Sequence, residues 1–143
     1  MEYIVELRDG NKVVKMKNPE LGAYEELVLD IFSSNDVATL VSGTSLSTPI
    51  DMRSFMSMSL ITESWTAGNI GLYMAQTESG QYNPVIDEDG AYVEISGYIT
   101  GSWASFPIVP SFPISYVKLW SKNTASAASV VQAATRTFRI IKK

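Results

Sequence analysis

Apolar and small polar residues alternate along most of the chain from residue 36 onward. A period of two places one face of a strand in a core and the other in water, which is typical of antiparallel sheets. Turn sequences rich in Gly, Asn, Asp and Ser separate the alternating stretches. Strands repeated in this way predict an all-β fold, an antiparallel β-sandwich of jelly-roll-like arrangement with roughly eight strands. The clearest alternating stretches are residues 37–41, 56–60, 70–75, 92–95, 114–120 and 135–141.

The first residues of the chain predict a β-hairpin. Residues 3–7 and 12–16 are rich in β-branched side chains and flank Arg8-Asp9-Gly10-Asn11. Asp-Gly favours the tight turn of a hairpin, because both residues tolerate positive φ angles.

Residues 19–33 fit two structures. Apolar residues from Leu21 to Ile31 keep a helical spacing, whereas residues 28–32 also suit a strand, so helix and strand both stay open. We expect residues 1–35 to form a hairpin and arm that contacts neighbours, and residues 36–143 to form the β-sandwich domain.

Composition lowers the expectation of an enzyme. The 143 residues include no Cys and no His, and 11 Lys and Arg stand against 15 Asp and Glu. Thiolate and histidine chemistry are therefore missing, together with the commonest transition-metal ligands. The net charge of −4 argues against binding nucleic acid, and no apolar run approaches the ~18 residues of a membrane span. We predict a protein that is not an enzyme, with no cofactor, no metal site, no nucleic acid and no membrane segment.

Charge is distributed unevenly along the chain. Residues 31–100 hold eight acidic residues and one base, Arg53, whereas residues 101–143 hold six basic residues and no acid. In one interpretation the strands interleave and the charges mix within one sandwich. In the other, a basic C-terminal face docks on an acidic neighbour, which could be another copy of the chain.

Two motifs resemble chemical sites and favour structural explanations. Gly43-Thr44-Ser45 with Pro49 resembles the nucleophile motif of subtilisin-like proteases, which needs a histidine that this chain lacks. We expect its hydroxyls to bond the backbone. Asp87-Glu88-Asp89-Gly90 resembles the start of a calcium loop, but its twelfth position is Tyr98 rather than Glu, so a hairpin turn is favoured.

The remaining carboxylates give no catalytic pair. Glu63, Glu78, Asp87 and Glu94 are the candidates for glycoside hydrolysis, and no spacing fixes two of them at the required separation. We expect solvated surface carboxylates.

Aromatic and proline-rich segments supply the candidate binding residues. The three tryptophans favour packing in the core or at its rim, and the alternative is a carbohydrate platform of Tyr98 and Trp103 with Phe106. Residues 106–113 contain three prolines and predict an extended loop whose apolar side chains need cover, from the domain's own core or from an adjacent subunit. The candidate interface comprises Tyr3, Val5, Leu7, Phe106, Ile108, Val109 and Phe112.

Five segments taken together resemble a known group of proteins. They are a serine-rich stretch at 42–51, a Trp-Thr-Ala turn at 65–70, a hairpin at 77–93, the strand Tyr-Val-Lys-Leu at 116–121 and a closing strand at 131–138. Over residues 40–141 the chain resembles small β-sandwich structural proteins of tailed bacteriophages and prophages. The shared features are turns and strands, without chemistry, and the first 35 residues lie outside them.

The resemblance implies a virion protein assembled in the host bacterial cytoplasm. The expected function is that of a capsid decoration, or cement, protein on the outer surface of the major capsid protein. The expected partners are that protein or other virion proteins, and further copies of the chain, with a trimer favoured. The alternatives are a receptor- or carbohydrate-binding module of a tail or fibre, and a neck or tail connector.

Overall fold

The computed structural model describes residues 3–8, 11–17, 24–27, 34–66 and 68–143, with side chains from residue 34 onward. The chain divides into two compact units, Met1–Ser33 and Ser34–Lys143. In the described part of the chain no helix is long and apolar enough to cross a membrane.

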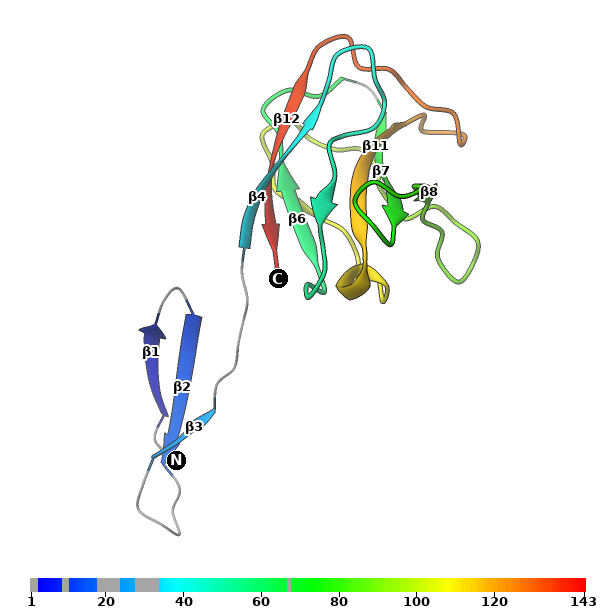
Figure 1. Ribbon diagram of the computed structural model, residues 1–143. Helices are drawn as coiled ribbons and strands as arrows, with labels where there is room; N and C mark the ends of the chain where they lie inside the picture. The colour runs from blue at the N-terminus through cyan, green and yellow to red at the C-terminus, as the bar shows by residue number, and fades with distance from the viewer. Residues whose placement is uncertain (1–2, 9–10, 18–23, 28–33, 67) are drawn as a thin grey trace. The chain divides into compact units, whose positions relative to one another are not determined.

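The N-terminal unit contains a three-stranded antiparallel sheet. Strand β1 (Tyr3–Arg8) pairs with β2 (Asn11–Lys17), which also pairs with β3 (Tyr24–Leu27) (Figure 1). The predicted hairpin is confirmed, although its turn residues Asp9 and Gly10 lie outside the described residues. Within the ambiguous segment, residues 24–27 form a strand, and residues 28–33 lie outside the described residues.

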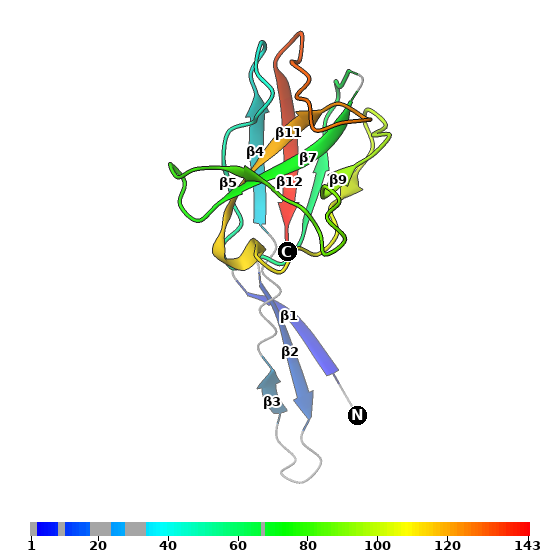
Figure 2. The same cartoon turned by 90° about the vertical axis from the view of Figure 1, so that its right-hand side faces the viewer.

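The C-terminal unit is built from two antiparallel sheets packed face to face (Figures 1 and 2). Sheet I has the order β10-β6-β12-β4, and sheet II has the order β5-β11-β7-β8, with β9 also pairing with β7. The strands of sheet I are β4 (Ser34–Leu40), β6 (Met58–Ile61), β10 (Ala104–Ser105) and β12 (Arg136–Lys142). Those of sheet II are β5 (Ile50–Asp51), β7 (Asn69–Ala75), β8 (Asn83–Pro84), β9 (Glu94–Ile95) and β11 (Tyr116–Lys122).

The core lies between the two sheets and follows the predicted alternation. Leu40 of β4 and Phe138 of β12 face it from sheet I, and Leu72 of β7 and Leu119 of β11 face it from sheet II, all at most 1% exposed. The one helical element among the described residues is a single 3-10 turn, η1 (Phe112–Ile114). The all-β antiparallel sandwich predicted from the sequence is confirmed.

Hydroxyl groups connect the two sheets along one side of the sandwich. The Thr48 amide donates to the carbonyl of Thr39 on β4 at 2.8 Å, and the Thr39 amide donates to Thr48 Oγ1 at 2.9 Å. The adjacent Ser47 Oγ accepts the amide of Leu119 on β11 at 2.8 Å. The segment that resembles a protease motif therefore holds strands in place, and its hydroxyls bond the backbone as predicted.

Charges from the two parts of the sequence mix within the sandwich. Basic residues from 101–143 pair with acidic residues from 31–100 at N···O distances of 2.9 Å for Lys122–Glu94, 3.3 Å for Lys142–Asp36 and 3.7 Å for Arg139–Glu63. Lys122 and Lys142 are both buried. The fold therefore supports the interpretation in which the acidic and basic residues mix within one sandwich.

Candidate docking groove

Two adjoining hollows form a large concave surface on the sandwich unit. Their volumes are about 670 and 680 Å³, and both are lined by Val85, Ile86 and Ser111. We call the two together the docking groove. It lies between residues 74–94 and the proline-rich segment 107–115.

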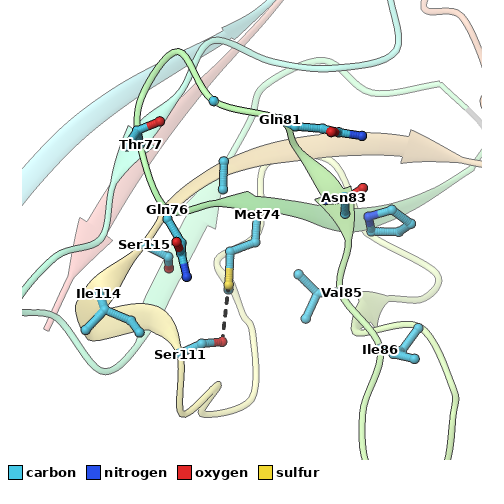
Figure 3. A pocket seen from close by; sticks show the side chains of 13 residues that line it. Met74, Gln76, Thr77, Gln81, Asn83, Val85, Ile86, Ser111, Ile114 and Ser115 are labelled. Atoms are coloured by element: carbon cyan, nitrogen blue, oxygen red, sulfur yellow. Dashed lines mark hydrogen bonds between the residues drawn. The ribbon is translucent and has the colours of Figure 1, made fainter.

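Three isoleucines stand exposed around the docking groove. Ile86, Ile108 and Ile114 are 58%, 68% and 66% exposed, and each lines one or both hollows. Figure 3 shows Ile114 and Ile86 on opposite sides of the first hollow, with Met74 and Val85 between them. Apolar side chains gathered at a concave surface are typical of a site that binds another molecule.

The wall formed by residues 107–115 is held in a fixed conformation. Phe112 is fully buried and anchors the segment in the core. Its amide donates to the carbonyl of Val109 at 3.0 Å, and Ser111 Oγ donates to Met74 Sδ at 3.2 Å across the first hollow (Figure 3). Prolines restrict φ along the segment. An ordered wall therefore presents two of the exposed isoleucines, Ile108 and Ile114.

The second hollow has an acidic rim. Asp87 Oδ1 accepts the amides of Asp89 and Ala91, each at 2.9 Å, and Gly90 has a φ of +79°. This is the hairpin turn favoured by the sequence. In the described residues no group of three or more acidic, His or Cys side chains could hold a metal ion. The carboxylates of residues 87–89 line the hollow, and no Lys or Arg is among the lining residues of either hollow.

The candidate interface residues of the proline-rich segment separate into two groups. Phe106, Val109 and Phe112 are only 4%, 6% and 0% exposed and belong to the domain's own core. Phe106 and Phe112 are therefore unavailable to a neighbour, Val109 offers only the small surface with which it lines the second hollow, and Ile108 is the one exposed candidate of this segment. The other three candidates, Tyr3, Val5 and Leu7, belong to β1, and their contact with a neighbour stays a prediction.

The three residues of the predicted carbohydrate platform do not form one exposed surface in the structure. The Tyr98 hydroxyl donates to the carbonyl of Ser102 at 2.8 Å and accepts the amide of Thr62 at 2.9 Å, so it serves to hold two loops together. Trp103 is 48% exposed and lines a separate hollow of about 300 Å³, with the Arg139 guanidinium 6.0 Å from its ring centroid. Since Phe106 is in the core, only Trp103 keeps the exposure that a stacking surface needs.

An aromatic and basic row along the outer face of β11 was missed by sequence reasoning. Lys118 Nζ lies 4.4 Å from the ring centroid of Tyr82, and the Arg53 guanidinium lies 4.8 Å from that of Tyr116. Burial, and after it the charge of Glu78, raises the pKa of Tyr82. The sequence feature that could have revealed this row is the order Tyr, Lys, Trp and Lys at every second position of residues 116–122.

Comparison with protein-family models, with curated proteins and with solved structures finds no match to this chain.

Proposed function

We propose that this protein is a structural protein of a tailed-bacteriophage virion, a capsid decoration protein that binds the outer surface of the major capsid protein. The observation that carries the proposal is the docking groove, a concave surface with exposed Ile108 and Ile114 on one wall and exposed Ile86 on the other. Contact with a neighbouring protein would remove this apolar surface from water, which contributes about 25 cal/mol per Å². The resemblance of residues 40–141 to phage β-sandwich proteins supports the same proposal.

Assembly into a homo-oligomer, with a trimer favoured, is part of the proposal. Closed symmetry lets one chain repeat its contacts around a capsid axis. The three-stranded N-terminal sheet supplies edge strands, and edge strands can pair with another chain. Because the chain contains no Cys, assembly in the host cytoplasm requires no oxidation.

Copy number in purified virions tests the proposal. We expect quantitative mass spectrometry to find the protein in a fixed ratio to the major capsid protein, and cryo-electron microscopy to place it in icosahedral order on the outer surface. A few copies per particle, confined to one vertex or to the tail, would contradict decoration and favour a neck connector or a receptor-binding module.

A carbohydrate-binding module of a tail or fibre is the second candidate function. The half-exposed Trp103 favours it, because an aromatic ring beside polar side chains can stack on a sugar. If it is correct, Trp103→Ala abolishes binding on a glycan array, and Ile99→Ala, a control at another exposed apolar residue, leaves binding unchanged. The absence of binding to any host polysaccharide would remove this candidate.

A further inference from the structure

We propose that the docking groove binds an extended segment of a partner protein that carries apolar residues together with lysine or arginine. This inference rests on the proposed function, under which the partner is the major capsid protein, and it names the chemistry that the groove selects.

The shape of the docking groove favours an extended segment. The two hollows meet at Val85, Ile86 and Ser111, so a segment can run from one hollow into the other. Side chains on one face of a strand recur every two residues, at a spacing of about 6.6 Å. In the proposed complex, apolar side chains on one face of the bound segment contact Ile86, Ile108 and Ile114, and side chains on the other face reach the rim.

The charge of the rim selects a basic segment. Of the carboxylates that line the second hollow, Glu94 is paired with Lys122 at 2.9 Å. Asp87, Glu88 and Asp89 take part in none of the ion pairs of the described residues. These three residues leave a charge of −3 beside exposed isoleucines, and an approaching Lys or Arg would find no competing cation among the lining residues.

The N-terminal unit of a second copy fits the docking groove less well. Residues 1–33 contain four basic and seven acidic residues, a net charge of −3, which repels the rim. The strand with the most lysines, β2, is already paired on both sides, with β1 and β3. A partner of different sequence is therefore the occupant that the charges favour.

Methyl NMR of the full chain with matched peptides tests the inference. The probes are short capped peptides that alternate valine with lysine, valine with glutamate or valine with glutamine. We expect the lysine peptide to shift the δ1 methyl signals of Ile86, Ile108 and Ile114, and to leave that of the buried Ile140 in place. Equal shifts with the glutamate peptide, or no shift with any peptide, would overturn the inference.

A variant with fewer rim charges tests, on capsids, whether the acidic rim favours a basic segment. Neutralising two rim charges with Glu88→Gln and Asp89→Asn should weaken binding to capsids stripped of this protein by about threefold to tenfold, and should reduce its salt dependence. The control Glu63→Gln removes an exposed carboxylate outside the groove and should bind as the wild type does. If the rim variant binds capsids with wild-type affinity and salt dependence, the inference that the rim selects a basic segment is wrong. The proposed function as a capsid decoration protein would be unaffected by that result. A wild-type chain that binds no capsid would contradict decoration, and the peptide experiment would still decide what the groove binds.

Discussion

Gly71 lies on β7 directly opposite Trp120 of β11, and the indole occupies the space where a side chain would be. A Cβ built on Gly71 would lie 2.8 Å from Trp120 Cε3. The rings of Tyr73 and Tyr92 pack edge to face against the same indole at centroid distances of 4.9 and 5.6 Å. Gly71 therefore makes room for a small aromatic cluster on the outer face of sheet II.

Gly71→Ala should lower the free energy of unfolding by about 1–3 kcal/mol, because the buried indole must shift to accept the added methyl group. Chemical denaturation measures the loss. In a double-mutant cycle with Trp120→Phe the cost of Gly71→Ala should shrink, since the smaller ring leaves space. Identical costs in both backgrounds would show that the indole is not the cause.

A second prediction at the residue scale concerns the ion pair of Asp51 and Arg53. The Arg53 guanidinium, 2.8 Å from Asp51 Oδ2, holds the pKa of this carboxyl below its ordinary value of 3.8. The folded state therefore binds the proton less tightly than the unfolded chain. The stabilisation is fully present above pH 3.8 and is lost as the pH falls through the lowered pKa.

Asp51→Asn should thus cause a small loss of stability at neutral pH that disappears in acid. The loss is small because both side chains are about half exposed. Thermal unfolding from pH 7 downward measures it, with Asp89→Asn as the control. A deficit of the same size at every pH would show that charge is not the cause.

At the scale of elements, a buried polar network joins the loop before β7 to β11 and β12. Gln132 is fully buried; its Nε2 donates to Ser121 Oγ at 2.8 Å, and its Oε1 accepts Arg136 Nε at 3.0 Å and Thr66 Oγ1 at 2.7 Å. Arg136 also donates to Ser64 Oγ. The side chains of Gln132 and Arg136 thus bond to each other and to the hydroxyl groups of neighbouring elements.

Gln132→Leu should destabilise the protein by about 3 kcal/mol, because it leaves the buried Arg136 Nε and Ser121 Oγ without the hydrogen bonds that Gln132 makes to them. Gln132→Glu keeps oxygen acceptors toward Arg136 and should recover part of the loss. The measurement is the free energy of unfolding in urea. A leucine variant as stable as the wild type would show that the polar network makes no net contribution to the free energy of unfolding.

The long strands were predictable from sequence, and the short ones were not. Alternation over residues 70–75 and 135–141 matches β7 and β12 to within one residue. Strands β5, β8 and β10 have two residues each, which is too short for a period to be read. Likewise Phe106 and Ile108 are both apolar residues of one proline-rich loop, and only the path of the backbone decides that one is buried and the other exposed.

At the scale of the whole molecule, every residue of the core cluster whose burial is described lies within Ser34–Lys143. The sequence placed the division between the two parts at residue 35, where period-two alternation begins. It could not show how the charges combine, because ion pairs such as Lys142–Asp36 join residues more than 100 positions apart in the sequence.

Residues 34–143 expressed alone should fold. Circular dichroism should show β-structure, and denaturant should unfold the fragment in one cooperative transition, because the fragment contains every described residue of the core cluster. The docking groove lies within this fragment too, so its peptide binding should match that of the full chain. A fragment that unfolds without cooperativity would contradict an independent sandwich unit.

The pairing of β4 with β12 has a mechanical consequence. Ser34, at the start of β4, is the register partner of Lys142 at the end of β12, so both ends of the sandwich unit lie at one end of a strand pair. A pulling force applied between Ser34 and the C-terminus would open that pair one hydrogen-bonded step at a time, as a zip opens, rather than shear all its bonds together. The ion pair and hydrogen bond of Lys142, with Asp36 and the carbonyl of Asp51, lie at the point where such peeling would begin.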